Sequence, residues 1–154
     1  MIAQKQIITT EPVDIKITGI TLLSVEEYEA CKDVIPRAVS WWWLRSPSAH
    51  YVKYVAYVVY DGWVYDLDVD FGTGARPALQ ISNLASVNLS IGDKLMLAGR
   101  TWTVISGTLA LCDDIVGETK FREDWKMPDA NNYEKSDVKK WLENWARERG
   151  ILEG

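Results

Sequence analysis

The sequence has little of what most catalytic and metal sites are built from. Its 154 residues include one histidine and two cysteines. His50 alone cannot form a histidine-rich metal site, and nothing in the sequence completes a Ser-His-Asp triad around it, so a loop histidine is the favoured interpretation. Cys31 and Cys112 lack the spacing of zinc or redox motifs and are expected to be reduced and structural, although a single bridge between them stays open. The sequence therefore predicts no enzyme activity, no metal and no cofactor.

Positive charge and long apolar runs are also scarce. Lys and Arg total 17 against 22 Asp and Glu, which gives a net charge of −5 and a pI near 4.9. Binding to a nucleic-acid backbone needs clustered Lys and Arg, so no direct nucleic-acid binding is expected. No stretch reaches the roughly 18 to 20 apolar residues of a membrane span, and residues 1–19 lack the apolar run of a signal peptide. We expect a protein of the cytoplasm or of a virion, without membrane contact.

Large aromatic rings are abundant instead. The chain has eight tryptophans and seven tyrosines but two phenylalanines. This composition predicts a core or a binding surface built on rings that carry a hydrogen-bond donor. A hydrophobic share of 47% and a charged share of 25% are those of an ordinary soluble globular protein. At this length we expect one domain over residues 1–154, with residues 1–12 as a polar arm that could be flexible.

The stretch from residue 41 to residue 79 organises the chain, and its centre is a hairpin. Residues 51–60 and 63–71 read as strands joined by Asp61-Gly62, a dipeptide that favours a two-residue type I′ turn. That turn sets the register, and one face of the hairpin then consists of apolar or aromatic cross-strand pairs and is expected to be core. The pairs are Tyr60 with Trp63, Val58 with Tyr65, Ala56 with Leu67, Tyr54 with Val69 and Val52 with Phe71.

The opposite face of the same hairpin is half polar and is the predicted contact surface for a partner. In the expected register Lys53 lies across from Asp70, and Tyr57 lies across from Asp66. Aspartates at positions i, i+2 and i+4 share a strand face, and three carboxylates could bind Ca²⁺. Their spacing departs from that of an EF-hand, so a solvated acidic face is favoured and no metal is predicted. The predicted partner-binding residues are Lys53, Tyr57, Asp66, Asp68 and Asp70.

Two helices are expected. The first follows Ser24 and Glu27, which form a capping box, and should run to about residue 31. The second follows Ser136, carries an apolar stripe at helical spacing and ends at Gly150. The stripe consists of Val138, Trp141, Leu142 and Trp145.

The remaining segments predict strands and loops. Strands are expected at residues 13–20, 39–44 and 109–112, and a second hairpin over residues 94–106 should turn at Gly99-Arg100, which suits type II′. Alternation sends Trp41 and Trp43 to one side of their strand and Trp42 to the other. Arg45 and Arg76 flank prolines and are expected to bond backbone carbonyls or acidic neighbours. The sum is an α+β domain with small twisted antiparallel sheets and two helices. Turns or loops are expected at residues 45–48, 72–74 and 117–133.

Three segments resemble a large uncharacterised family of bacterial and phage domains. They are WWWLRSP at residues 41–47, YVAYVVYDGWV at 54–64 and GARPAL at 74–79, where family members have WWLRSP, a strand ending in DG-x-V, and VRPAL. The likeness continues upstream in ITLLSVEEYEA and downstream in IGDKLMLAGRTWTVIS. The resemblance implies a C-type-lectin-like fold, and it transfers no catalytic residue because the family has none established.

The order of these segments differs from the order in the family. Members typically begin with the hairpin that residues 91–106 resemble and end at VRPAL, whereas here the VRPAL-like segment comes first. The chain is therefore similar to a circularly permuted member of that family. Permutation is physically tolerable because the termini of compact domains often lie close together.

Two functions of different classes follow from these observations. The resemblance and the aromatic content favour a non-enzymatic binding module of phage or bacterial origin, which recognises a protein or glycan partner through its loops and the half-polar hairpin face. The alternative is a small acidic phage-encoded inhibitor that occupies a basic surface on a host defence or nucleic-acid enzyme. The sequence leaves the oligomeric state open.

Overall fold

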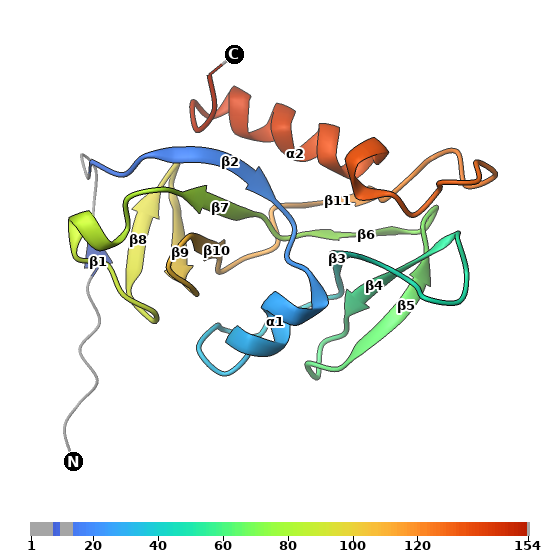
Figure 1. Ribbon diagram of the computed structural model, residues 1–154, viewed down its shortest axis with the longest axis horizontal. Coiled ribbons are helices and arrows are strands. Elements are labelled where there is room, and N and C mark those ends of the chain that lie inside the picture. The colour runs from blue at the N-terminus through green and yellow to red at the C-terminus, as the bar shows by residue number, and fades with distance from the viewer. Residues whose placement is uncertain (1–7, 10–13, 154) are drawn as a thin grey trace.

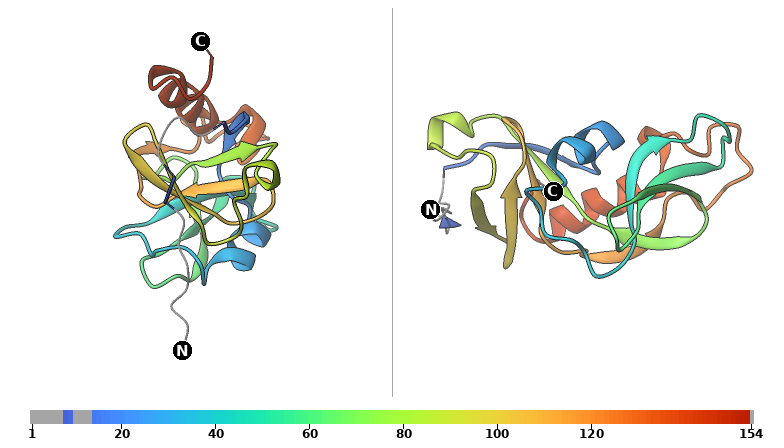
Figure 2. Two further views of the ribbon diagram at one scale, coloured as in Figure 1. Left: turned by 90° about the vertical axis from the view of Figure 1, so that its left-hand side faces the viewer. Right: turned by 90° about the horizontal axis from the view of Figure 1, so that it is seen from below.

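The computed structural model describes residues 8–9 and 14–153, which form an α+β fold with two α-helices and two mostly antiparallel sheets (Figure 1). The sheets lie side by side along the long axis of the molecule and do not close into a barrel, as Figure 2 shows from two further sides. The six-stranded sheet has the order β1 (Ile8–Thr9), β8 (Lys94–Leu97), β9 (Arg100–Val104), β10 (Leu109–Cys112), β7 (Ala78–Ile81), β2 (Ile17–Thr21). The five-stranded sheet has the order β11 (Gly117–Lys120), β6 (Gly72–Ala75), β3 (Trp42–Pro47), β4 (Tyr54–Val58), β5 (Val64–Asp68).

Two stretches of chain cross between the sheets and join them. β6 leads through Arg76 and Pro77 into β7, and β10 leads through residues 113–116 into β11. β6 pairs with β11 and β7 pairs with β10, so the two crossing stretches run antiparallel to each other. The pairs β1–β8 and β3–β6 are parallel. Residues 84–153 therefore supply strands to both sheets, as residues 14–83 do.

Helix α1 (Val25–Cys31) begins as the sequence predicts. Ser24 Oγ accepts a hydrogen bond from the Glu27 amide at 3.1 Å, and Glu27 Oε1 accepts one from the Ser24 amide at 2.9 Å, which confirms the capping box. Tyr28 and Cys31 are buried, and Tyr28 meets Trp42 edge-on with ring centroids 5.5 Å apart. The helix thereby covers one face of the five-stranded sheet.

Helix α2 (Asp137–Glu148) contacts both β2 and β11 and so lies over the place where the sheets meet (Figure 1). Ser136 caps its first turn, and Gly150 ends it with a φ of +73°. The predicted stripe is confirmed, since three of its side chains are buried and Trp141 is partly buried. The fully buried members are Val138, Leu142 and Trp145. No helix in the described part of the chain is long and apolar enough to cross a membrane.

The five-stranded sheet is buried on both faces around β4. Val55 and Tyr57 face the main core, which also holds Trp43 and Trp102. Ala56 and Val58 face a second cluster beneath α1, with Trp42 and Leu44. Trp42 and Trp43 thus point to opposite sides, as alternation predicts.

The predicted register of the central hairpin is wrong by one residue. Val58 pairs with Val64 and Tyr54 with Asp68, instead of with Tyr65 and Val69. The Gly62 amide donates to the Val59 carbonyl at 2.9 Å, and the Val59 amide donates to the Trp63 carbonyl at 3.0 Å, so residues 60–62 form a three-residue loop. Gly62 has a φ of +93° and Asp61 is not left-handed, which matches a type I turn followed by a glycine bulge rather than a type I′ turn.

The changed register also changes which side chains are buried. Tyr60, Trp63, Tyr65, Phe71 and Val52, all predicted to be core, are between 48% and 68% exposed. Alternation could not select the register because β4 is apolar on both of its faces.

Several boundaries also differ from expectation. Residues 45–47 belong to β3, residues 72–74 belong to β6, and residues 117–120 form β11, although all three were predicted to be loop or turn. The second hairpin turns at Ala98-Gly99, both with positive φ, instead of at Gly99-Arg100. β2 begins at Ile17 rather than at residue 13, and β3 begins at Trp42 rather than at residue 39. Val13 and most of the expected arm, residues 1–7 and 10–12, lie outside the described residues.

Candidate functional site

The five predicted partner-binding residues do not form one surface. Tyr57 is 9% exposed and faces the main core. Asp66 and Asp68 pair across from Ala56 and Tyr54, on the opposite side of the hairpin from Tyr57. The cause is the register, because a shift of one residue moves one strand's side chains to the other face.

Lys53 and Asp70 also have different neighbours from those expected. Lys53 Nζ lies 3.6 Å from Asp68 Oδ2 and 5.2 Å from the ring centre of Trp125. A side-chain hydrogen bond with Asp68 raises the pKa of Asp70 above its ordinary value. Within residues 8–9 and 14–153, no three His, Cys, Asp or Glu side chains come together in a way that could hold a metal ion.

Two rings that the sequence predicted to be core, Tyr65 and Trp63, are exposed instead and share one face of the hairpin with the buried Tyr57. Trp41 meets Tyr57 edge-on with ring centroids 5.5 Å apart, and Tyr57 pairs across the strands with Tyr65. Tyr65 and Trp63 alternate along the same face of β5 and its approach. Trp41, Tyr65 and Trp63 are 44%, 56% and 67% exposed. We refer to Trp41, Tyr57, Tyr65 and Trp63 as the aromatic row.

A pocket of about 250 Å³ lies between the hairpin tip and the segment that follows α1, and Trp63 is the member of the row that lines it. Trp63 and Tyr60 stand at its mouth, and both rings are exposed. Trp42 and Arg76, each 1% exposed, lie at its closed end. The rest of the lining comes from Tyr28, residues 32–33, residues 35–38 and the tip residues 58–62.

Arg76 holds the closed end of the pocket together. Its Nε donates to the Cys112 carbonyl at 2.8 Å, and its Nη2 donates to the carbonyls of Pro36 at 2.8 Å and Asp113 at 3.1 Å. Its guanidinium carbon lies 4.8 Å from the ring centre of Trp42. These contacts confirm the prediction that Arg76 bonds backbone carbonyls. Burial in the protein lowers the pKa of Arg76, with the Asp113 charge acting in the opposite direction.

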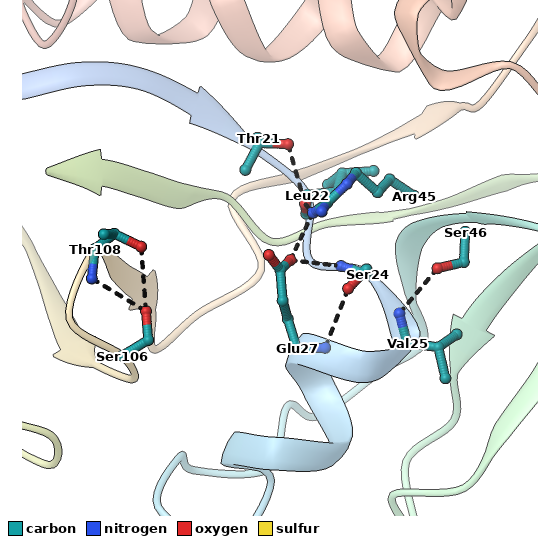
Figure 3. A network of polar contacts seen from close by, with 9 residues as sticks. All are labelled: Thr21, Leu22, Ser24, Val25, Glu27, Arg45, Ser46, Ser106 and Thr108. Atoms are coloured by element: carbon teal, nitrogen blue, oxygen red, sulfur yellow. Dashed lines mark hydrogen bonds and ion pairs between the residues drawn. The ribbon is translucent and has the colours of Figure 1, made fainter.

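The wall formed by α1 is held at the middle of the helix and at its N-terminal end. Tyr28 Oη donates to the Gly62 carbonyl at 2.8 Å and so ties the helix to the hairpin tip. Figure 3 shows the other anchor, where Arg45 Nη1 donates to the Leu22 carbonyl at 2.7 Å and to Glu27 Oε1 at 2.6 Å. The Val25 amide also donates to Ser46 Oγ at 2.9 Å. Arg45 therefore bonds a carbonyl and an acidic neighbour, as predicted.

The two cysteines and the histidine do not line the pocket. Cys31 and Cys112 are free and buried, and burial raises the pKa of each thiol to about 11. Neither is a ready nucleophile or metal ligand at neutral pH, because the thiolate is the reactive form. His50 is exposed next to Tyr51, with ring centroids 6.4 Å apart.

Sequence reasoning missed the pocket and both rings at its mouth. The one available signal was Asp61-Gly62 itself, since this dipeptide also fits a three-residue loop with glycine in the left-handed position. That alternative register places Tyr60 in the loop and Trp63 just before β5, where both rings are exposed.

The comparison with known proteins agrees with the likeness noted in the sequence. Residues 14–83 match the model of a family described as a domain of unknown function, DUF6273. This region contains α1, β2 to β7 and every side chain that lines the pocket. No curated protein and no solved structure matches the chain. A DUF6273 domain of unknown function is thus found at residues 14–83 of this chain.

Proposed function

We propose that this protein is a non-enzymatic binding module that recognises a protein or glycan partner through the aromatic row and the pocket at its end. The observation that carries the proposal is the exposure of Trp63 and Tyr60, at 67% and 68%, beside a preformed hollow. Tryptophan and tyrosine dominate the binding energy of protein interfaces, and aromatic rings also stack on sugars. An exposed row of such rings rimmed by charged groups is typical of an interaction site.

We also propose that the fold is a circularly permuted C-type-lectin-like domain. Support comes from the placement of the quoted segments, since WWWLRSP leads into and forms β3, and GARPAL spans the crossing from β6 to β7. Further support comes from the chain ends, because Ile15 and Ile17 line a hollow together with residues 150–153. A chain in which residues 15–17 and 150–153 line one hollow can be joined there and opened elsewhere.

The acidic inhibitor has less to support it. Asp66 is exposed, but Asp68 already pairs with Lys53, and Tyr57 is turned toward the core. The proposed acidic face is therefore smaller and partly neutralised. The net charge of −5 is the remaining observation in its favour.

The test combines partner capture with two matched variants. The tagged full chain is used to capture proteins from a bacterial lysate and is applied to a glycan array, and the affinity for each recovered partner is measured by calorimetry. The double variant Trp63→Ala/Tyr65→Ala removes two exposed rings of the row, and we expect it to weaken binding by roughly 30-fold or more. Trp125→Ala is the control, because Trp125 is also exposed but lies beside Lys53 at the other end of β4.

The control should bind as the unchanged protein does. A partner that tolerates the double variant but is lost with Trp125→Ala would place the contact surface at the opposite end of the hairpin and refute the proposal. A partner bound through the array rather than from the lysate would identify a glycan ligand.

A further inference from the structure

The buried guanidinium of Arg76 has no carboxylate partner among the described residues. No ion pair within 4 Å includes Arg76, and its three hydrogen bonds all go to backbone carbonyls. The Asp113 carboxylate is the negative charge that most raises the pKa of Arg76, but its own oxygens accept hydrogen bonds from other groups. Lys94 Nζ donates to one oxygen at 2.9 Å and Thr103 Oγ1 donates to the other at 2.5 Å. The closed end of the pocket therefore carries a positive charge without a paired carboxylate among the described residues. Burying such a charge is costly, and a negatively charged ligand would offset that cost.

The guanidinium also has donors to spare on the side of the pocket. An arginine has five N–H groups, and three of those on Arg76 are engaged, which leaves the two on Nη1. Pro36 and Trp42, which contact the guanidinium, line the pocket together with Arg76. Nη1 is also not among the fully enclosed polar atoms without a partner in the described residues, which are Tyr133 Oη and Trp145 Nε1.

The charges at the mouth leave this single positive charge in place. Two cations, Lys32 and Arg37, and two carboxylates, Asp33 and Asp61, line the mouth, so their charges cancel and the lining carries the net charge of Arg76. Arg37 lies against the hairpin tip, and Asp33 stands on the same rim. The lining therefore suits a group with one negative charge better than a dianion.

We propose that this pocket binds a carboxylate group, with one carboxylate oxygen on Nη1 of Arg76 and the rest of the ligand against Trp63 and Tyr60. The inference rests on the proposed function and names the chemistry that the binding surface recognises. A volume of about 250 Å³ is below the roughly 300 to 1,000 Å³ of pockets for drug-sized ligands, so the site suits one residue-sized group. The carboxylate belongs either to a small free acid or to the chain end of a protein.

The test titrates the isotope-labelled full chain with benzoate, followed through the Arg76 Nε and Trp63 indole resonances. Benzamide has the same ring without the charge, and inorganic phosphate is the dianionic comparison. We expect saturable shifts of both resonances with benzoate and at least tenfold weaker binding of benzamide and phosphate. A short peptide with a free C-terminus, compared with its amidated form, separates the two sources of the carboxylate.

Variants at the exposed rim keep the test independent of folding, since Arg76 itself is buried and its replacement could unfold the chain. Arg37→Gln should weaken benzoate binding by about two- to fivefold, as expected for an exposed charge. Trp63→Ala should weaken it further, whereas Trp125→Ala should leave it unchanged.

Three results would overturn the inference. They are no saturation with benzoate or the peptide up to about 10 mM, equal binding of benzamide, and tighter binding of phosphate. Failure of the carboxylate titration together with loss of partner in Trp63→Ala/Tyr65→Ala would refute this inference and leave the proposed function standing. If benzoate binds but the double variant still recovers its partner, the proposed function is refuted and the carboxylate site stands.

Discussion

Arg76 combines two roles that are usually separate. Its bonds to the Cys112, Asp113 and Pro36 carbonyls tie both crossing stretches of chain to the segment that follows α1. The rigid planar fork of arginine suits this task, and lysine, with three donors on a single nitrogen, does not reproduce it. These contacts leave Nη1 as the unengaged nitrogen of Arg76, so the residue that joins the sheets also lines the pocket and carries the charge of the proposed carboxylate site.

Glu27 and Arg45 form a second polar centre that can be tested through pH. Burial raises the pKa of Glu27, but hydrogen bonds from Arg45 and Ser24 more than offset this, and the net pKa lies below the ordinary value of 4.5. A carboxyl group with a depressed folded pKa adds stability that is present above its unfolded pKa and is lost as the pH falls through the folded value. The stabilisation should therefore be complete at neutral pH and be lost as the pH falls through the folded pKa, which lies below 4.5.

We predict that Glu27→Gln lowers the free energy of unfolding by about 1 kcal/mol near pH 7, a value discounted for the partial exposure of the pair. The difference between the variant and the unchanged protein should shrink as the pH falls through the folded pKa of Glu27, because the protonated carboxyl group is then as uncharged as the glutamine that replaces it. Urea unfolding at several pH values measures the difference. Glu26→Gln is the matched control, since Glu26 lies in the same helical turn without an ion pair among the described residues, and a pH-independent deficit in Glu27→Gln would contradict the charge argument.

At the scale of elements, what could be predicted depended on how local the determining interaction is. The capping box of α1 and the buried stripe of α2 were predicted correctly, because each is encoded within a few residues and both partners lie on the same helix. The register of the β4–β5 hairpin was not, because Asp61-Gly62 permits two turn types and both faces of β4 are apolar. The pocket was missed for the same reason, because the register decides where the tip residues that line it lie.

Strand β6 was also missed by the sequence analysis, because the interaction that determines it is not local. Residues 72–74 read as a loop because two of them are glycines, yet Gly74 pairs with Trp42 of the neighbouring parallel strand. A Cβ atom at Gly74 would lie 2.5 Å from the Trp41 carbonyl oxygen and 2.9 Å from Ile115 Cγ2. Glycine is therefore required here for close approach of two backbones, which sequence alone does not reveal.

We predict that Gly74→Ala destabilises the protein by about 1 to 3 kcal/mol, because a backbone atom cannot move aside as a flexible side chain can. Gly72→Ala in the same strand is the matched control, since nothing lies within 4 Å of a Cβ at that position. The control should change stability by less than about 1 kcal/mol. Thermal and urea unfolding of the two variants give the comparison, and equal effects would show that the close approach at Gly74 is not the cause.

At the scale of the whole molecule, the two halves of the sequence are interleaved in space. Residues 14–83, which match the DUF6273 model, form β2 to β7, and residues 84–153 complete both sheets with β8 to β11. Ile15 and Ile17, near the start of the continuous described segment 14–153, line a hollow with Gly150, Ile151 and Leu152 near its end. Residues 82–93 connect the halves, and their Ser90 and Ile91 are exposed. A break between residues 90 and 91 would therefore leave β2 to β11 uncut.

We predict that a rearranged chain running from residue 91 to 153, through a short Gly/Ser linker, and on from residue 14 to 90 folds to the same structure. The ends to be joined line one hollow, and closing a short flexible loop changes stability slowly with its length, so the loss should stay within about 2 kcal/mol. Urea unfolding and the amide NMR spectrum make the comparison with the unchanged chain. A second rearrangement opened between Tyr57 and Val58 cuts buried strand β4 and should not fold. If both rearranged chains lose cooperative unfolding, the order of the segments is itself required, and the proposal that this domain is a tolerated circular permutant fails.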